Sequence, residues 1–333
     1  MRKATITGVG HHVPDRKVNN QYFNDLYNKD IDTFLKAKRN IETRYFMADD
    51  EATSDLIVPA AQTAMEKASI RAEDLDLIIV ATDTPDYISP STASVVQHKL
   101  KATNAGIFDL NSACAGFVTA MDVATKYIQT DKAYRNILVV GAYGMSKFLD
   151  WDDYKIASMF ADGAGAVVVS ESNGDNGEVS ACALYGDGQY HDYMGIYAGG
   201  THMPTTNAAI ENKDNLLRFA KKIPVETNGI HWPRLIHNLL DRIKKDVSDI
   251  DTFFLTQLNI ETINSTLDNL KVPRERSHNV MNKFGYTGSA CIPMAISDAV
   301  QNQKLKKGDL VFMLGSGGGM SMAALSMTWG YDT

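Results

Sequence analysis

Residues 108–117 read FDLNSACAGF, and this segment indicates the fold class of the chain. An apolar strand ends at Leu110, small residues make a tight turn, and an apolar helix begins just after Cys114. A strand, a tight turn and a helix in direct succession are typical of an α/β fold.

The segments on either side continue this alternation. Short, uninterrupted apolar runs at residues 77–82, 137–141 and 166–169 are typical of buried strands. Residues 54–68 and 115–130 show the spacing of amphipathic helices. Because apolar strands of this kind are covered on both faces, we expect an α/β fold with a mostly parallel core sheet.

The second half of the chain repeats landmarks of the first. Three pairs recur 174 to 177 residues apart: Asp74 and Asp249 before strands, Ser112 and Ser289 in a Ser-Ala-Cys turn, and Gly141 and Gly315 at strand ends. A domain-sized offset indicates an internal duplication rather than a solenoid, although strand starts in unrelated α/β proteins can look alike. We therefore predict an N-terminal half at 1–172 and a related C-terminal half at 173–333, joined by a polar, Gly- and Asn-rich connector.

Composition excludes several classes of protein. The 333 residues carry a formal net charge of −7, which argues against a nucleic-acid or membrane-surface partner. No apolar run reaches the roughly 18–20 residues of a membrane span, and no signal peptide is visible before the first strand. Three cysteines make neither a disulfide framework nor a zinc spacing, so we expect no metal site and a cytoplasmic location.

Cys114 is the candidate nucleophile. At a helix N-terminus the unpaired N–H groups and the helix dipole favour a thiolate, and the same groups can hold a developing oxyanion. Small neighbours on both sides allow a substrate to approach the sulfur. On spacing alone, a cysteine at such a position is more often part of the core.

Four segments of the chain carry a family resemblance. Residues 109–117 resemble the active-site segment of the thiolase-fold condensing enzymes, specifically β-ketoacyl-acyl-carrier-protein synthase III. The run ADGAGA at 161–166 is similar to the family's GDGAGA, GSGGGMS at 315–321 resembles its GFGGG segment, and GYTGSACIP at 285–293 lies where the family has GNTSAASIP. Four motifs in the same order make the resemblance specific.

The resemblance implies a thiolase fold. Its two duplicated βαβαβαββ-type halves would each hold a five-stranded sheet, in a five-layer α-β-α-β-α arrangement. It also implies that Cys114 accepts the acyl group, that the Gly318 backbone supplies an oxyanion-hole donor, and that the chain forms a homodimer or pairs with a paralogue.

Two family residues are replaced in this chain. Residues 256–259, TQLN, fall at the family's HQAN motif, so Thr256 takes the place of the histidine and Asn259 remains as a candidate for binding the thioester. Tyr286 takes the place of the asparagine in GNTS. Both replacements are hydrogen-bond donors but poor bases near neutral pH, so we expect decarboxylative condensation to be impaired. No other histidine, including His231 and His278, is expected to fill the gap.

Residues 32–41 resemble the segment that binds the thioester's pantetheine and nucleotide. Phe34 falls at a family tryptophan and Lys38 at an arginine. The basic cluster of Lys36, Lys38 and Arg39 would suit an acidic carrier protein, although it is equally typical of a solvated helix end.

These observations predict an acyltransferase similar to synthase III. An acyl group would pass from acyl-coenzyme A or an acyl-carrier protein onto Cys114 and then to a second substrate, in fatty-acid, polyketide or related biosynthesis. No permanently bound cofactor is expected, since the coenzyme A or phosphopantetheine thioester is the substrate. The alternative is a catalytically reduced structural or regulatory paralogue, or the partner subunit of a heteromeric condensing enzyme.

Overall fold

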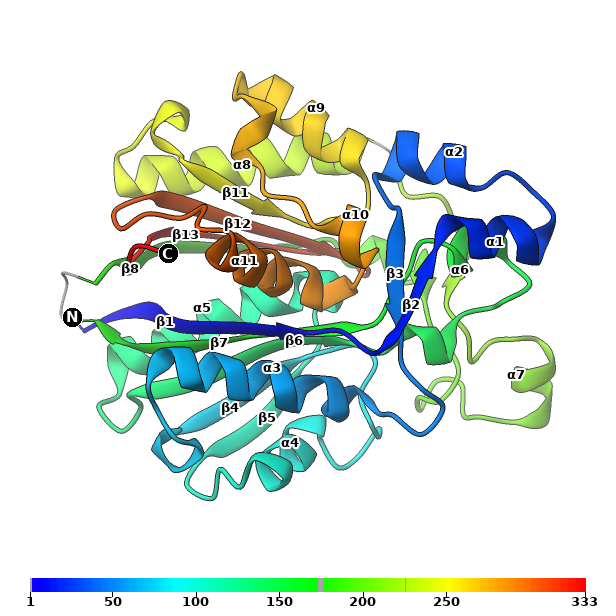
Figure 1. The fold of residues 1–333 in the computed structure, drawn as a ribbon, viewed down its shortest axis with the longest axis horizontal. Coiled ribbons are helices and arrows are strands. Elements are labelled where there is room, and N and C mark those ends of the chain that lie inside the picture. The colour runs from blue at the N-terminus through cyan, green and yellow to red at the C-terminus, as the bar shows by residue number, and fades with distance from the viewer. Residues whose placement is uncertain (1, 173–175, 225) are drawn as a thin grey trace.

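Two β-sheets are stacked with one layer of helices between them and one outside each (Figure 1). The computed structural model describes residues 2–172, 176–224 and 226–333. The layers follow the order helix, sheet, helix, sheet, helix, as a thiolase fold requires.

The first sheet comes from the N-terminal part of the chain and has five strands. In spatial order these are β1 (Lys3–His12), β7 (Gly163–Ser172), β6 (Asn136–Tyr143), β4 (Leu77–Ala81) and β5 (Gly106–Leu110). β4 is parallel to both β5 and β6, whereas β7 is antiparallel to β1 and β6. The β4, β6 and β7 strands are buried along nearly their whole length because helices cover both faces.

The second sheet lies above the first in Figure 1. Its strands are, in order, β11 (Thr252–Leu255), β12 (Leu310–Gly317), β13 (Ser321–Thr328) and β8 (Glu178–Gly186). Among the described residues of this sheet, only β11 and β12 are parallel to each other. Beside β11, Ser277 makes a single bridge to Phe253 where a fifth strand would lie.

Helices of both halves form the central layer. α5 (Gly116–Thr130) and α11 (Cys291–Gln301) each contact strands of both sheets. The first nine residues of α11 are all buried, as expected for a helix enclosed on every side. Gly165 lets the backbones approach, because a Cβ there would lie 2.6 Å from Met294 N.

The outer layers cover the remaining sheet faces. α3 (Thr53–Ala68) and α4 (Thr92–Leu100) pack on the first sheet, and α8 (Glu226–Ile243) with α9 (Ile260–Leu270) covers the second. The α3 helix passes so close to β1 that a Cβ at Gly10 would lie 2.3 Å from Ala60 O.

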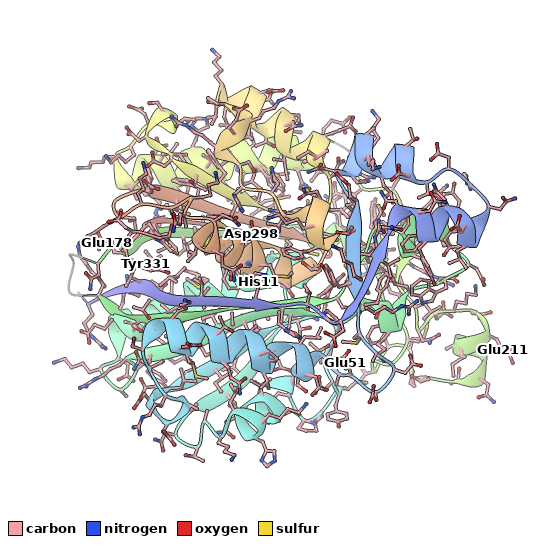
Figure 2. The ribbon with its side chains drawn as sticks, viewed as in Figure 1. His11, Glu51, Glu178, Glu211, Asp298 and Tyr331 are labelled. Carbon is pink, nitrogen blue, oxygen red and sulfur yellow. The ribbon has the colours of Figure 1, made fainter. Side chains whose placement is uncertain are left out.

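Shorter elements lie at the edge of the layers. They are β2 (Arg16–Asn19), β3 (Thr43–Phe46), β9 (Met194–Gly195), β10 (Arg218–Phe219), α1 (Asn20–Tyr27), α2 (Asp32–Phe34), α6 (Tyr154–Ala157), α7 (Asn207–Glu211) and α10 (Met281–Phe284). The β2–β3 and β9–β10 pairs are small antiparallel ribbons. α7, with Glu211 at its end, lies at the periphery of the molecule (Figure 2).

The predicted α/β class and five-layer order are confirmed, while two details differ. The expectation of mostly parallel sheets is wrong, because buried apolar strands carry no signal of their direction. Five strands were expected in each half, but the second sheet has four among the described residues, since the segment at Ser277 pairs at one position only. The division at 172/173 borders residues 173–175, which lie outside the described residues, and it stays a prediction.

Candidate active site

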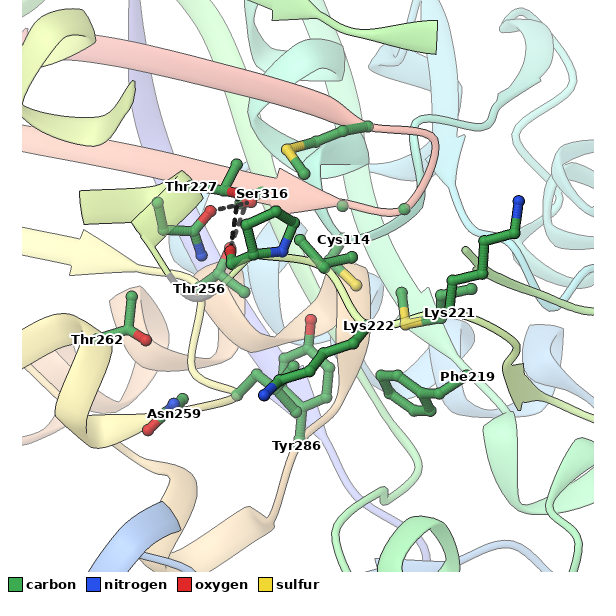
Figure 3. A pocket seen from close by; sticks show the side chains of 18 of the residues that line it. Cys114, Phe219, Lys221, Lys222, Thr227, Thr256, Asn259, Thr262, Tyr286 and Ser316 are labelled. Carbon is green, nitrogen blue, oxygen red and sulfur yellow. Dashed lines mark hydrogen bonds between the residues drawn. The ribbon is translucent and has the colours of Figure 1, made fainter. Parts of the chain in front are cut away.

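A cavity of about 500 Å³ lies where strand ends of both sheets meet. Cys114, Thr256, Tyr286, Gly318 and Asn259 all contribute to its wall (Figure 3). Five of the seven predicted site residues, far apart in sequence, are therefore brought together.

Cys114 lies in a short 3₁₀ helix, Ala113–Ala115, that leads from β5 into α5. The turn before it is tight: Ala113 has a positive φ of 46°, a conformation that costs an alanine roughly 1–2 kcal/mol. The side chain of Asn111 supports the turn by accepting a hydrogen bond from Ala113 N at 3.0 Å. The cysteine is therefore held at a defined position at the end of the sheet, with 3% of its surface exposed.

The glycine-rich segment at the end of β12 packs directly against this turn. A Cβ at Gly315 would lie 2.8 Å from Ala115 Cα, and one at Gly317 would lie 2.7 Å from Cys114 N. Only glycine permits this approach at either position. As a result, the backbone of Gly317 and Gly318 lines the cavity next to the cysteine.

The Cys114 thiol is protonated at neutral pH. Burial raises its pKa well above the ordinary value, and the nearby carboxylate of Asp83 acts in the same direction. The hydroxyl of Tyr286 lowers the pKa of the thiol and opposes both effects. The expectation that the helix N-terminus favours a thiolate stays a prediction, and burial of the sulfur acts against it.

Tyr286 is held between aromatic rings and backbone hydrogen bonds. Its ring lies 5.4 Å from that of Phe160 and 6.4 Å from that of Tyr143, measured between centroids. Its N–H donates to Met159 O at 3.1 Å, and its carbonyl accepts from Ala161 N at 2.9 Å. Burial raises the pKa of the phenol well above 10, so the hydroxyl remains a neutral donor.

Thr256 follows β11 and also lines the cavity. Its Oγ1 accepts a hydrogen bond of 2.8 Å from Ser316 N, and Ser316 Oγ donates to Asn228 Oδ1 at 2.9 Å (Figure 3). A hydroxyl that accepts such a bond keeps its own proton to donate. Asn228, at the start of α8, also lines the cavity.

Gln257, two residues after the end of β11, is hydrogen-bonded to the segment that leads to Tyr286. Its side chain accepts from Val280 N at 2.7 Å and from Met281 N at 3.1 Å, and donates to His278 O at 2.9 Å. Asn259 caps α9 by accepting from Glu261 N at 3.0 Å. These bonds fix the position of Thr256 relative to Tyr286.

The predicted thioester-binding residues are only partly brought to the cavity. Asn259 lines it, whereas Phe34 is 49% exposed and Lys38 forms an exposed ion pair with Glu261 at 2.8 Å. Arg39 is the residue of this segment that reaches the wall, with its guanidinium 5.6 Å from the Phe34 ring and its Nε buried without a hydrogen-bond partner among the described residues. Residues 35–39 form a wider π-helical turn, which changes the side chain that faces inward.

The rest of the wall is largely apolar and was not predicted. It includes Phe160, Met194, Phe219, Ile223, Pro224, Trp232, Leu258 and Met320. Most of these residues lie in the irregular region after β8 or between the family motifs. The sequence there shows neither the spacing of a helix nor that of a strand, so it gave no signal of a binding site. An apolar wall of this kind suits an acyl chain.

No histidine lines the cavity in the described part of the chain. His231 stacks on Tyr185 at 4.4 Å, and His11 hydrogen-bonds Ser297 at 2.8 Å. His278 hydrogen-bonds Asp298 at 2.8 Å. Figure 2 shows Asp298 on α11 with His11 of β1 beside it.

Neither a metal cluster nor a membrane-spanning helix was found. Across residues 2–172, 176–224 and 226–333, no three His, Cys, Asp or Glu side chains are grouped so as to hold a metal ion. In the same ranges, no helix combines the length and the apolar character needed to cross a bilayer.

Comparison with known proteins agrees with this geometry. The sequence matches the family described as 3-Oxoacyl-[acyl-carrier-protein (ACP)] synthase III over residues 108–188, and the C-terminal part of the same family over residues 240–329. A beta-ketoacyl-[acyl-carrier-protein] synthase III of Syntrophomonas wolfei is 36% identical, over 99% of this chain and 98% of its own.

Solved structures of this family are similar over the full length. The 3-oxoacyl-(acyl carrier protein) synthase III of Pseudomonas aeruginosa has a TM-score of 0.90 with 25% identity and covers 100% of both chains. The corresponding protein of Aquifex aeolicus has a TM-score of 0.87 with 29% identity, over 99% of this chain and 100% of its own.

Proposed function

Because this chain belongs to the 3-oxoacyl-[acyl-carrier-protein] synthase III family of acyltransferases, we propose that Cys114 takes an acyl group from a thioester and passes it to a second substrate. The donor is acyl-coenzyme A or an acyl-carrier protein, and the setting is fatty-acid, polyketide or related biosynthesis. The observation that carries the proposal is the Cys114 sulfur at the wall of an apolar cavity, next to the backbone of Gly317 and Gly318.

Acyl loading uses the features that this chain retains. The Cys114 sulfur attacks the thioester carbonyl, and the oxygen of that carbonyl gains negative charge. The N–H groups of Cys114 and Gly318 stabilise this charge, because fixed donors in a site shut off from water gain strength without reorganising. The apolar wall, including Phe160 and Trp232, receives the acyl chain.

The second step is where this chain departs from its family. Thr256 and Tyr286 stand where the family's catalytic histidine and asparagine are expected, and both lie on the cavity wall. In decarboxylative condensation these two groups stabilise an enolate, and loss of one such donor costs about 3–4 kcal/mol. Because neither a threonine nor a neutral phenol is expected to replace both donors, we propose that ordinary malonyl condensation is slow and that another acceptor takes the acyl group.

The surroundings of the cavity support a carrier-borne donor and a dimeric assembly. Arg39, Lys221 and Lys222 bring positive charge to the cavity wall, which suits the phosphates of coenzyme A or an acidic carrier protein. β5 is the last strand at its end of the first sheet, and Ile88, in the loop between β4 and α4, is 83% exposed. We propose pairing with a second copy or a paralogue, in a reducing cytoplasm that suits three unpaired cysteines.

The alternative is a catalytically reduced paralogue or partner subunit. Intact-protein mass after incubation with a panel of acyl thioesters separates the two. We expect a gain of one acyl group on the wild type and none on Cys114→Ala. No gain on the wild type, or an equal gain on the variant, would favour the alternative.

Release of labelled CO₂ from a malonyl thioester tests the second step. We expect little release by the wild type and a higher rate for the double variant Thr256→His with Tyr286→Asn. Release by the wild type at a rate typical of a biosynthetic synthase would contradict the proposed role of the two replacements.

A further inference from the structure

The cavity has a polar side and an apolar side. Figure 3 shows Thr227, Thr256 and Ser316 on one side of Cys114 and Phe219 on the other. The polar side is built from the residues at the ends of β11 and β12 and at the start of α8. Of these polar residues, the reaction described above uses only Thr256.

Asn228 lines the polar side and is held by one end of its amide. Its Oδ1 accepts a hydrogen bond of 2.9 Å from Ser316 Oγ. Among residues 2–172, 176–224 and 226–333, Asn228 Nδ2 has no hydrogen-bond partner, yet this atom is not shut off from water. Because the residue is half-buried on the cavity wall, an N–H donor is available to a molecule that enters the cavity.

Thr256 supplies a second donor close to Asn228. Its Oγ1 accepts a hydrogen bond of 2.8 Å from Ser316 N, so its own proton is free to donate. Both side chains are thus bonded to the same residue, Ser316, which keeps the two donors near each other. Thr256 is 5% exposed, so a group bound there is largely removed from water.

Ser316 makes room for a ligand at this point. The family motif GFGGG has phenylalanine where this chain has Ser316 in GSGGG. A serine side chain occupies less space than that of phenylalanine, and its hydroxyl holds the Asn228 amide. Ser316 directly precedes Gly317, where a Cβ would lie 2.7 Å from Cys114 N, so this space is next to the nucleophile.

The two donors are suited to an uncharged oxygen. A carboxylate buried against neutral donors alone would lose more hydration than those donors return, because buried charges need an opposite charge. The cations on the cavity wall, Arg39, Lys221 and Lys222, come from other segments, and both lysines are exposed. A carbonyl oxygen has two lone pairs and can accept from an amide and a hydroxyl at once.

We propose that Asn228 and Thr256 together bind a neutral carbonyl oxygen of the second substrate, which makes Asn228 a specificity-determining residue. The acceptor accordingly carries an amide, ester or ketone carbonyl next to its reacting atom, rather than a free carboxylate. This inference deepens the proposed function and rests on it, since the acceptor is the molecule that takes the acyl group from Cys114.

Three thioethers of coenzyme A test the proposal without acyl loading. Alkylation of the coenzyme A thiol with iodoacetamide, iodoacetate or 1-iodopropane gives S-carbamoylmethyl-, S-carboxymethyl- and S-propyl-coenzyme A. The three share the pantetheine arm and end in a neutral amide, a carboxylate or an apolar group. A thioether cannot acylate Cys114, so the Kd of each is measured by isothermal titration calorimetry on the intact protein.

The wild type should bind the carbamoylmethyl thioether about tenfold more tightly than the propyl thioether, the size of one well-formed hydrogen bond. Asn228→Asp keeps an oxygen that accepts from Ser316 Oγ but loses the N–H donors, so the two Kd values should come within about twofold. Neither of these ligands has a charged end group, so the added charge of the aspartate affects both alike. Asn238→Asp makes the same change at an exposed position of α8 and should keep the wild-type ratio.

Two results with the wild type would overturn the proposal. The first is a carboxymethyl thioether that binds at least as tightly as the carbamoylmethyl one, because a cation would then recognise the end group. The second is a carbamoylmethyl thioether that does not bind, or binds no better than the propyl one. A wild-type ratio in folded Asn228→Asp, or an equal loss in Asn238→Asp, would also overturn it.

Thr256→Val and Thr256→Ser decide the matter if Asn228→Asp fails to fold. The valine removes the hydroxyl and the serine keeps it, so only the valine variant should lose part of the preference for the carbamoylmethyl thioether. Loss in both variants or in neither overturns the proposal. Acyl loading of Cys114 is measured separately by intact mass. Failure to load would count against the proposed function, while the Kd ratios still judge Asn228.

Discussion

Replacing Tyr286 with phenylalanine removes a hydroxyl that acts on the nucleophile. The Tyr286 hydroxyl lowers the pKa of the Cys114 thiol, which burial holds high. A hydrogen bond to a charged group contributes about 1.5–3 kcal/mol, and 1.36 kcal/mol corresponds to one pKa unit. Tyr286→Phe should therefore raise the pKa of Cys114 by one to two units and slow acyl loading about 10- to 100-fold.

The assay is the single-turnover rate of acyl transfer to Cys114, followed by rapid quenching and intact-protein mass spectrometry. Tyr143→Phe is the matched control, because Tyr143 is an equally buried phenol whose ring lies 6.4 Å from that of Tyr286. We expect this control to load within a few-fold of the wild type. Thermal unfolding of both variants shows whether the fold is retained.

An unchanged or faster loading rate in a folded Tyr286→Phe protein would refute the reasoning. It would mean that the hydroxyl restrains the sulfur rather than stabilising its charge. An equally large fall in the loading rate of Tyr143→Phe would also refute it, because the fall would then be caused by altered packing of the aromatic cluster.

Three further outcomes follow from the structure. Gly317→Ala should abolish loading and lower the melting temperature, because its Cβ would lie 2.7 Å from Cys114 N, whereas Gly318→Ala should fold normally, since its nearest contact is a flexible Met194 methyl group at 3.3 Å. Arg39→Ala should raise the KM for an acyl-coenzyme A about tenfold with little change in kcat, while Lys38→Ala, which breaks only an exposed ion pair, should stay within twofold in steady-state assays. Burial would raise the pKa of Asp298, but hydrogen bonds from the neighbouring histidine and lysine hold it at about 2. The stabilisation of the fold by the ionised Asp298 is therefore present above about pH 4 and lost as the pH falls toward 2. Urea unfolding should show Asp298→Asn destabilised by on the order of 1 kcal/mol at pH 7, with the difference vanishing near pH 2.

Local patterns in the sequence were enough to predict the elements around the nucleophile. The apolar run at 77–82 forms β4, the helical spacing at 115–130 forms α5, and Cys114 lies in the turn before that helix. These features depend on hydrophobic periodicity and on small turn residues, which act within a few positions of the chain. The resemblance to the synthase III family added the five-layer order and the residues Thr256 and Tyr286.

Strand direction, strand number and the cavity wall depend on distant contacts. Buried strands look alike whether parallel or antiparallel, so β7 could not be assigned a direction from its own residues. The wide turn of residues 35–39 brought Arg39 to the cavity wall in place of Lys38, which no local pattern indicated.

The sequence by itself determined where the nucleophile lies along the chain, and the tertiary structure alone decided its protonation. A helix N-terminus predicts a thiolate at Cys114, yet burial among the groups around Tyr286 and Asp83 raises the pKa of the thiol. Desolvation and charge interactions depend on every atom packed around a group, and those atoms come from segments far apart in sequence.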